Sequence, residues 1–385
     1  KHESPDHAAN RAIIDALGIK VVEVNSAANL QVLHAMLSMS NVAVDCLFGT
    51  GMSRPLSDFF SNVVELVNRC EALRIAVDIP SGLNGDDGHI YGKVVRADFT
   101  YTIAFPKTGL YVGDSAEATG TIRILDIGIP EKTAADAGIH GTLLDEEWLR
   151  AHLPQRSATS YKNTFGHVGI VAGSSGMSGA CVLSAKGALR SGAGLVTVLA
   201  DREIQPIVAI AVSEAMVRPV TWPNDKALEW LVTNTKVQVI GPGMGKNDVK
   251  RQVLARLLQQ SEGTVVIDAD ALSLLAGGDG SALSRTRAHC ILTPHPGEMA
   301  RLLGKTNKEV QEDRLGIARM VSERFGCVVV LKGHHSIIAA PDGRYAVNAS
   351  DSAALATAGR MCSQALFPHL QRRVLKPLTL PVQAS

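Results

Sequence analysis

Several common features are scarce or missing in this sequence of 385 residues, and each absence excludes a class of protein. The formal net charge is only +1, so the chain lacks the basic footprint that nucleic-acid binding requires. No apolar run reaches the roughly 18 residues that span a membrane, and we expect no signal peptide. We therefore expect a cytoplasmic protein that binds neither nucleic acid nor a membrane.

The six cysteines are scattered along the chain, without a CxxC pair and without a histidine nearby at zinc spacing. Isolated cysteines of this kind predict reduced thiols rather than a disulfide framework or a zinc site. An initiating methionine is also missing, because the chain begins at Lys1 in polar, helix-like sequence. We therefore expect a fragment whose true N-terminus is absent.

Apolar residues and glycines are abundant instead: the hydrophobic content is 46%, and there are 35 glycines. This composition is typical of a large α/β protein with many tight turns between strands and helices. The length is enough for two domains of roughly 100–200 residues each. A polar stretch with prolines at 130–160 separates two apolar regions and looks like a linker.

Strand-like apolar runs alternate with helical segments in both regions, which predicts βαβ units around parallel sheets. In the first region we expect strands at 20–24, 41–48, 74–79, 98–104 and 120–125, and helices at 6–17, from about 25 to 39, and at 56–69. In the second region we expect strands at 167–172, 195–200, 237–240, 264–267, 290–292, 328–331 and 336–340, and a helix at 180–191. Ligands of parallel sheets bind at the carboxyl ends of the strands, so the residues that follow each strand are the functional candidates.

In the first region, two acids lie at predicted strand ends. Asp45 lies in the last turn of its strand, and Asp78 ends the next one and is followed by a Pro-Ser-Gly run that contains Ser81. This arrangement offers a ligand a carboxylate, a hydroxyl and free backbone. The alternative is that these side chains only cap a helix or turn. The loop 49–55, GTGMSRP, could likewise be a ligand loop or a tight turn.

In the second region, four strands in a row end on residues of a ligand-binding type. A Gly/Ser loop at 173–180 opens a helix, and loops of this kind present N–H groups to anions. The other three motifs are GPGMG at 241–245, Asp-Ala-Asp at 268–270 and TPHPGE at 293–298. Four such motifs on one sheet edge favour a binding site over a set of unrelated turns.

The final motifs are a histidine and a lysine at strand ends. Prolines on both sides of His295 hold its backbone extended, which suits a ligand contact, although a structural turn would also explain it. Lys332 follows a buried apolar run and is interpreted as a phosphate contact, the alternative being a surface lysine. His334 and His335 are expected to point in opposite directions and so to make a poor metal pair.

These motifs together resemble the bifunctional NAD(P)H-hydrate repair enzyme family. The resemblance rests on FGTGMSRP, VDIPSGLNGDDG, SGMSGA, GPGMG, DADAL, LTPHPGEMARLL, LKGHHS and ALATAG, and it covers the chain from about residue 1 to Gly359. It implies an α/β fold: an incomplete Rossmann-like three-layer epimerase domain at 1–140, a linker at 141–157, and an incomplete ribokinase-like dehydratase domain at 158–359. The remaining residues, 360–385, are expected to be an aberrant tail.

The resemblance also implies a reaction. Hydration of the nicotinamide ring inactivates NADH or NADPH, and each hydrate, called NADHX or NADPHX, exists as two epimers. The epimerase interconverts the epimers, and the dehydratase uses ADP (or ATP) with Mg²⁺ to phosphorylate the ring hydroxyl before elimination. Phosphate is a better leaving group than hydroxide, and phosphoryl transfer needs mainly positioning, N–H donors, a metal ion and one base. A homo-oligomer is implied when the protein is intact.

The resemblance assigns roles to individual residues of this chain. In the epimerase, the substrate would contact Gly49, Thr50, Gly51, Met52, Ser53, Arg54, Pro55 and Asp78. A potassium ion would be held by Asp45 and Ser81. In the dehydratase, the hydrated dinucleotide would contact Ala180, Gly243 and His295. The adenine nucleotide would contact Lys332, Gly333, His334, His335, Ser336 and Gly359.

Two departures from the family pattern predict an impaired copy. The family's upstream GxGNNGGDG loop, which supplies a potassium-ligating Asn, is absent. The family also continues ATAG with a variable residue and then Gly-Asp, whose Asp is the general base, whereas no acid occurs from Gly359 to Ser385. We expect a frameshift after Gly359, because codons that encode 360–366 can also be read two bases on as Asp-Val-Leu-Thr-Gly-Ile. Sequencing the locus tests this expectation.

Two other interpretations remain open from the residues. A ribokinase-like vitamin kinase would use the same glycines at the sheet edge, although VDIPSG and HPGE favour repair. A nucleotide-binding remnant would keep His295 and Lys332 without turnover. Binding and turnover assays run side by side separate the three.

Overall fold

The computed structural model describes residues 4–152, 165–276 and 281–349. Its contacts divide the chain into two units. The first runs to Gly128 apart from the short segment Tyr111–Gly113, and the second takes that segment together with the chain from Ile129 onward. The sequence was interpreted as a first domain that ends at residue 140. The first unit ends at Gly128, about one short helix earlier.

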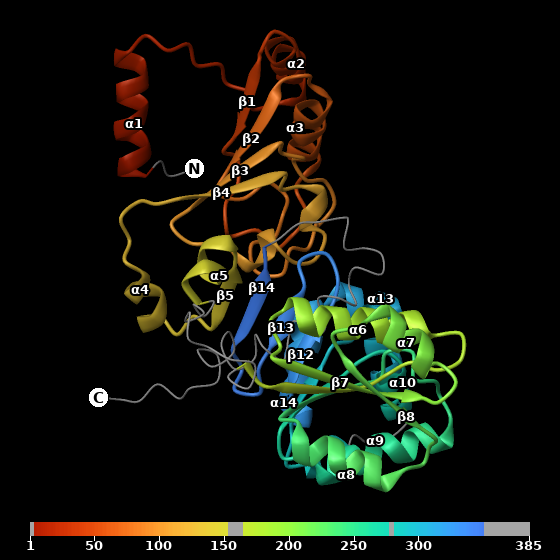
Figure 1. The fold of residues 1–385 in the computed structure, drawn as a ribbon. Helices are drawn as coiled ribbons and strands as arrows, with labels where there is room; N and C mark the ends of the chain where they lie inside the picture. The colour runs from red at the N-terminus through yellow and green to blue at the C-terminus, as the bar shows by residue number, and fades with distance from the viewer. Residues whose placement is uncertain (1–3, 153–164, 277–280, 350–385) are drawn as a thin grey trace. The chain divides into compact units, whose positions relative to one another are not determined.

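The first unit is built on a parallel sheet of four strands in the order β1-β2-β3-β4 (Figure 1). The strands are β1 (Val42–Asp45), β2 (Leu73–Val77), β3 (Phe99–Ile103) and β4 (Thr121–Leu125). The helices before β4 are α1 (Pro5–Ala16), α2 (Leu30–Ser38) and α3 (Asp58–Arg69). An acid in the first turn of α3 and a base in the last match the helix dipole, and its residues Val63 and Val64 are buried.

One predicted element of this unit is wrong. Residues 20–24 form no strand, and Val21 is exposed. A strand needs a partner for its backbone N–H and C=O groups, and none of the described strands pairs with this segment. Its apolar residues alone could not reveal this.

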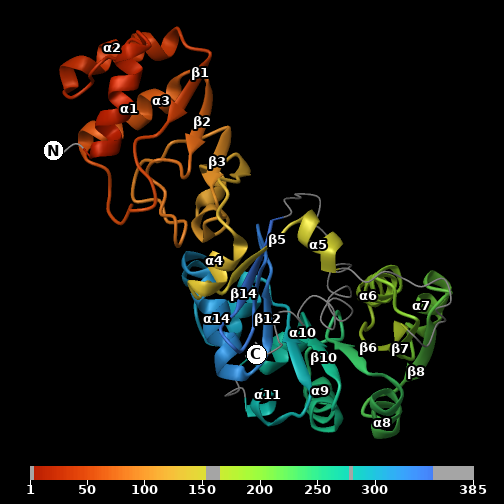
Figure 2. The same cartoon turned by 90° about the vertical axis from the view of Figure 1, so that its left-hand side faces the viewer.

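The second unit is built on a sheet of ten strands in the order β5-β14-β13-β12-β11-β10-β9-β6-β7-β8, and Figure 2 shows the row from β14 to β8. The strands are β5 (Gly141–Leu144), β6 (His167–Val171), β7 (Leu195–Asp201), β8 (Met216–Val220), β9 (Val237–Ile240), β10 (Thr264–Ile267), β11 (His289–Leu292), β12 (Val328–Leu331), β13 (Ile337–Ala339) and β14 (Tyr345–Asn348). The pairs β12–β13 and β13–β14 are antiparallel, and the others are parallel.

Helices lie on both faces of this sheet, with α6 and α7 on one side of β7 and α8 and α9 on the other (Figure 1). The helices are α4 (Glu131–Asp136), α5 (Glu146–His152), α6 (Ser178–Arg190), α7 (Gln205–Ala211), α8 (Asp225–Asn234), α9 (Asp248–Gln260), α10 (Asp270–Leu275), α11 (Ser281–Arg285), α12 (Pro296–Leu303), α13 (Asn307–Glu312) and α14 (Arg314–Phe325). Cover on both faces explains why β12 is buried at all four positions.

The predicted α/β class and the parallel sheets are confirmed. The strands β5, β8 and β14 were not predicted. β5 falls within the stretch expected to be a linker, yet it pairs with β14 in the large sheet. Because β6, β9, β10, β11 and β12 are parallel neighbours, the loops that follow them share one edge of the sheet, which we call the carboxyl rim.

Candidate functional site

The carboxyl rim of the second unit is centred on a buried ion pair. The Lys332 ammonium lies 2.9 Å from Asp268 Oδ1 and 3.8 Å from Glu298 Oε2. The side chains of Lys332 and Asp268 are only 12% and 1% exposed. The Lys332 N–H also donates to Pro294 O at 2.8 Å, which joins the ends of β11 and β12. Lys332 is therefore not a surface lysine, and its charge is directed into the rim.

Asp268 keeps an unused acceptor in this cluster. Its Oδ2 atom is buried, and among the described residues nothing donates a hydrogen bond to it. A buried carboxylate oxygen without a partner is costly, so its persistence indicates a place for a donor or a cation. The sequence marked Asp268 only as part of the Asp-Ala-Asp motif after β10 and assigned it no role of its own.

His295 and Glu298 form a reciprocal cap at the start of α12. The Gly297 N–H donates to His295 Nδ1 at 3.0 Å, and the His295 N–H donates to Glu298 Oε2 at 2.8 Å. Partial burial is the largest effect on the pKa of His295 and lowers it. Glu298 raises this pKa, whereas Lys332 and Arg301 lower it. The net shift is downward, so the ring is neutral near pH 7. Because Nδ1 accepts a bond, the ring proton is assigned to Nε2. The cap supports the structural interpretation of His295, and its 45% exposed side chain also leaves the ring open to a ligand.

Two predicted substrate contacts are neighbours. Gly243 has φ of +60°, and a Cβ there would lie 2.9 Å from the Cβ of Ala180. Ser174 Oγ donates to Gly243 O at 2.9 Å, so the loop after β6 is bonded to the loop after β9. At Gly241, a Cβ would lie only 1.8 Å from Asp268 O. Glycine is therefore required where these loops press together.

The predicted nucleotide loop, Lys332–Ser336, corrects one expectation. His334 and His335 do not point in opposite directions, because their rings stack with centroids 4.0 Å apart. His335 has φ of +48°, a left-handed conformation that breaks the alternation of a strand. No group of three or more His, Cys, Asp or Glu side chains that could hold a metal ion occurs among the described residues. Gly359, also predicted to contact the nucleotide, lies outside the described residues.

In the first unit, Asp45 and Ser81 lie side by side. Asp45 Oδ1 accepts a bond from Ser81 Oγ at 2.7 Å, and its Oδ2 accepts one from the Ser81 N–H at 2.8 Å. Both residues are buried, and Ser81 Oγ accepts from the Phe48 N–H at 3.0 Å. The predicted cation ligands therefore meet at the ends of β1 and β2, within a network of internal hydrogen bonds.

Asp78 also lies in this unit, and its partner was missed by sequence reasoning. Its Oδ1 atom lies 2.5 Å from the Lys107 ammonium and accepts from the Ile103 N–H at 3.1 Å. Burial raises the pKa of Asp78, but the bonds from Lys107 and Ile103 outweigh burial and lower it. Asp78 has φ of +71°, which is strained for a residue with a side chain. No motif marked Lys107, because the contact depends on how the chain returns after β3.

The loop 49–55 is exposed except at Met52. Asn84 Nδ2 donates to Met52 O at 3.0 Å, which ties the loop to the segment after Ser81. The loop therefore lies beside the ends of β1 and β2, with six of its seven predicted contact residues open to a ligand.

Comparisons with known proteins match both units. A family model described as NAD(P)H-hydrate dehydratase matches residues 168–360, and a model described as YjeF-related protein N-terminus matches residues 1–109. A bifunctional NAD(P)H-hydrate repair enzyme of Moorella thermoacetica is 37% identical over 362 residues, which are 92% of this chain and 68% of that protein. The Escherichia coli enzyme is 35% identical over 321 residues, covering 83% of this chain and 60% of that protein.

The chain belongs to the bifunctional NAD(P)H-hydrate repair enzyme family. It spans about two thirds of the length of these curated relatives. Among solved structures, an ADP/ATP-dependent NAD(P)H-hydrate dehydratase of Bacillus subtilis, co-crystallised with ATP and Mg²⁺, gives a TM-score of 0.51 at 27% identity over 64% of this chain and 94% of that one. A ribokinase-like protein of Enterococcus faecalis gives 0.53 at 26% identity over 60% and 80%. The ribokinase-like prediction for the second unit is thereby confirmed.

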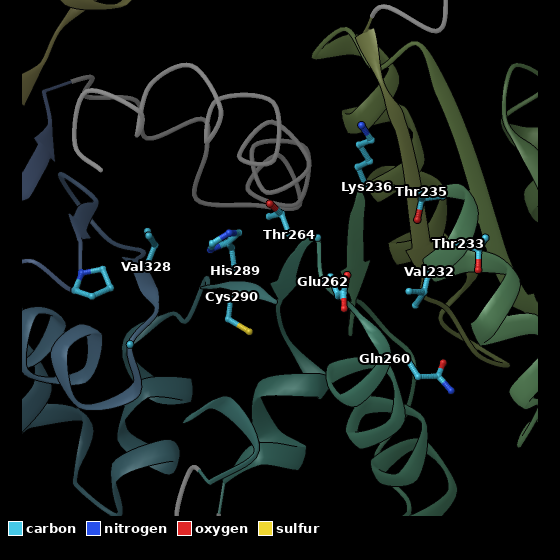
Figure 3. A pocket seen from close by; sticks show the side chains of 13 residues that line it. Val232, Thr233, Thr235, Lys236, Gln260, Glu262, Thr264, His289, Cys290 and Val328 are labelled. Carbon is cyan, nitrogen blue, oxygen red and sulfur yellow. The ribbon is translucent and has the colours of Figure 1, made fainter. Parts of the chain in front are cut away.

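A cavity of about 900 Å³ lies at the opposite edge of the same sheet (Figure 3). Its lining includes Thr264, His289 and Val328, which are the first residues of β10, β11 and β12. It contains none of the predicted site residues of this repair-enzyme homologue. Parallel sheets bind ligands at the carboxyl ends of their strands, so the carboxyl rim, not this cavity, is the candidate active site.

None of the helices that the structure describes combines the length and the apolar character that crossing a membrane requires.

Proposed function

We propose that this chain binds hydrated NADH and NADPH in both units, and that the second unit also binds ADP or ATP at its carboxyl rim. One observation carries this proposal: the loops that hold Gly243, His295 and Lys332 follow β9, β11 and β12, parallel strands on either side of β10, whose carboxyl end carries Asp268, the partner of Lys332. This is the placement expected where two nucleotides must react with each other. We also propose that the protein acts in the cytoplasm and forms homo-oligomers.

The reaction at the rim has two steps. The ring hydroxyl attacks the terminal phosphoryl group of the nucleotide, so a C–O–P link forms and the bond to the departing nucleotide breaks, giving AMP from ADP. The C–O bond to phosphate then breaks while the neighbouring carbon loses a proton, which restores the ring double bond. Lys332 places positive charge where phosphate charge develops, and neutral His295 offers an Nε2–H donor to the hydrated ring.

Magnesium would enter this site with the nucleotide. The carboxylates of Asp268 and Glu298 lie around Lys332, and Asp268 Oδ2 has an unused acceptor. Carboxylate oxygen is a ligand that Mg²⁺ prefers, and Mg²⁺ usually takes one or two carboxylates together with substrate phosphates. The residues therefore fit the ion without a dedicated protein cage.

The first unit would bring about epimerisation of the hydrated ring. Asp78 is held ionised by Lys107 beside the exposed loop 49–55, which places a carboxylate base next to the proposed substrate loop. Asp45 and Ser81 offer oxygen atoms at the ends of β1 and β2, a donor set that suits potassium. These residues fit the ion, and a charge-balancing cation near them would help to hold the dinucleotide phosphates.

We further propose that dehydration by this chain is slow. No carboxylate occurs from Gly359 to Ser385, where the family pattern has its general base. The loss of a positioned base lowers rates by on the order of 10²–10⁴. Binding is expected to survive, because the residues proposed to bind lie at or before Ser336 except for Gly359.

The test measures binding and turnover on the same preparation. Isothermal titration calorimetry with ADP–Mg²⁺ and with NADH hydrate should show two compatible ligands, while a coupled assay for NADH release should show slow turnover. Ordinary ADP-dependent turnover would contradict the slow-dehydration proposal. The absence of any ADP affinity would contradict the binding proposal, and phosphorylation of a vitamin alcohol in place of the hydrate would identify a kinase.

A further inference from the structure

A buried arginine outside the predicted site lies against the predicted nucleotide loop. Arg314, the first residue of α14, is only 7% exposed. Its Nη1 atom donates to His334 O at 2.6 Å, and its Nη2 atom lies 3.3 Å from His335 O and 3.4 Å from Leu331 O. One guanidinium therefore contacts three carbonyl groups within or beside Lys332–Ser336.

The helix itself gives Arg314 no electrostatic benefit. A cation in the first turn of a helix opposes the helix dipole, whose N-terminal end is positive. The preceding N-cap, Asp313, uses its Oδ1 atom to accept from the Gly316 N–H at 2.8 Å. The loop carbonyls are therefore an important source of the stabilisation that keeps this buried cation in place.

Gly333 shows how closely the guanidinium and the loop fit. A Cβ at Gly333 would lie 2.4 Å from Arg314 Nη2 and 2.7 Å from its Cζ. Gly333 is not among the glycines with a positive φ, so its backbone conformation does not require glycine; a Cβ there would instead have to displace the hydrogen-bonded guanidinium of Arg314. The glycine of the Lys-Gly motif is thus explained by the arginine packed against it.

The bonds to Arg314 also fix the direction of two peptide units. In a trans peptide the N–H points opposite to the C=O. Because the carbonyls of His334 and His335 both point to Arg314, the N–H groups of His335 and Ser336 point away from it, on the same side as each other. Successive N–H groups on one side of a turn are a recurrent way to hold phosphate oxygens.

We propose that Arg314 is a positioning residue for the adenine nucleotide: its guanidinium sets the loop Lys332–Ser336 in the shape that receives the nucleotide phosphates. This inference rests on the proposed function of the same rim. It assigns to Arg314 an effect on nucleotide affinity that is separate from the binding of the hydrated dinucleotide, which involves Gly243 and Ala180 on the far side of β10.

The first test replaces the arginine. Arg314→Met should weaken ADP–Mg²⁺ binding about 10- to 100-fold, the loss expected for one or two charge-assisted hydrogen bonds. NADH-hydrate affinity should stay within about twofold of the original value. Arg314→Lys keeps the charge but loses the planar fork, so it should give an intermediate ADP affinity. Arg319→Met, an exposed change on the same helix, should leave ADP affinity unchanged.

The second test removes the steric conflict. Gly333→Ala alone should sharply weaken ADP binding, because the new Cβ collides with the guanidinium. In an Arg314→Ala background the same change should cost at most about twofold, since the space is already vacant. The thermal midpoints of all variants are recorded so that only folded variants are compared, and Gly333→Ala alone tests the fit even where the Arg314 variants fold poorly.

The outcomes separate the inference from the function. If the unchanged protein does not bind ADP, the proposed function fails. If it binds ADP and Arg314→Met binds equally well, or if ADP and NADH hydrate are weakened to the same extent, the positioning role of Arg314 is wrong. Additive effects of Gly333→Ala and Arg314→Ala would also overturn it.

Discussion

The two units differ in how deeply they bury the charged residues at the ends of their strands. In the second unit, Lys332 and Asp268 are almost wholly buried at the rim of a ten-stranded sheet. In the first, Asp78 and Lys107 are each 21% exposed, beside a sheet of only four strands. Burial strengthens both the benefit of a paired charge and the penalty of an unpaired one. The comparison teaches that the same kind of strand-end pair should be far more sensitive to mutation in the larger unit.

The largest expected effect comes from breaking the buried pair. Lys332→Met leaves Asp268 buried without its cation, so unfolding free energy should fall by about 3–5 kcal/mol. Urea unfolding of the second unit measures this loss. Lys332→Met/Asp268→Asn should recover most of it, and Arg287→Met, which breaks an exposed pair with Glu262, should cost less than about 1 kcal/mol. If Lys332→Met lowered the free energy of unfolding as little as Arg287→Met does, the claim that burial makes the pair in the second unit more sensitive would be wrong.

A smaller effect is expected at the buried carboxylate of the first unit. Asp45→Asn disturbs bonds from Ser81 and Leu47 and should cost about 1–3 kcal/mol. If Asp45 also helps to bind potassium, KCl should raise the melting temperature above that in NaCl at equal ionic strength, and Asp45→Asn should abolish the difference. Asp58→Asn, an exposed change, is the matched control. An undiminished response to KCl in Asp45→Asn would remove this residue from the proposed cation site.

The partly buried pair of Asp78 and Lys107 should give a smaller change still. Lys107→Met should raise the pKa of Asp78, because the bond from Lys107 keeps it below the ordinary value. A depressed carboxyl pKa adds stability above the unfolded pKa, and this stability is lost as pH falls through the folded pKa. Lys107→Met should therefore cost about 0.5–1 kcal/mol at neutral pH and nothing in strong acid. Carbon NMR of the Asp78 carboxyl checks the direction; an unchanged pKa would show that Lys107 is not its partner.

The smallest effect concerns the protonation of His295. Because the pKa of His295 is lowered in the folded state, the unfolded state binds the proton at a higher pH than the folded state does. The contribution of His295 to the free energy of unfolding is therefore full above the unfolded pKa, and it declines as pH falls below that value. Proton NMR should find the ring neutral at pH 7. Lys332→Met should raise its pKa, since a nearby cation is removed. A fall in the pKa of His295 would contradict the arrangement around Asp268.

Much of the second unit could be predicted from the sequence. The strands that lead to Gly241, Asp268, His295 and Lys332 are mostly apolar runs followed by glycine, acid or proline, and parallel order then places their ends together. β5 was missed because it is short and its partner in the sheet is β14, about 200 residues further along the chain, whereas β14 also pairs with β13 across a short turn. The pairing of β5 with β14 leaves no local pattern.

Side-chain partnerships were less predictable. Lys107 reaches Asp78, and Arg314 reaches His334, only because loops return to the same place in the fold. The stacking of His334 on His335 depends on one left-handed residue that is not a glycine, and no propensity rule marks it in advance. Sequence patterns were enough to locate the carboxyl rim, whereas the side-chain contacts within it became known only from the structure.

Hydrogen–deuterium exchange with and without ADP–Mg²⁺ tests the central claim most directly. The account predicts new protection at Lys332–Ser336, at the carboxyl end of β12. Protection confined to the opposite edge, around Lys236 and His289 of the cavity in Figure 3, would contradict it, and so would no protection at all under saturating nucleotide.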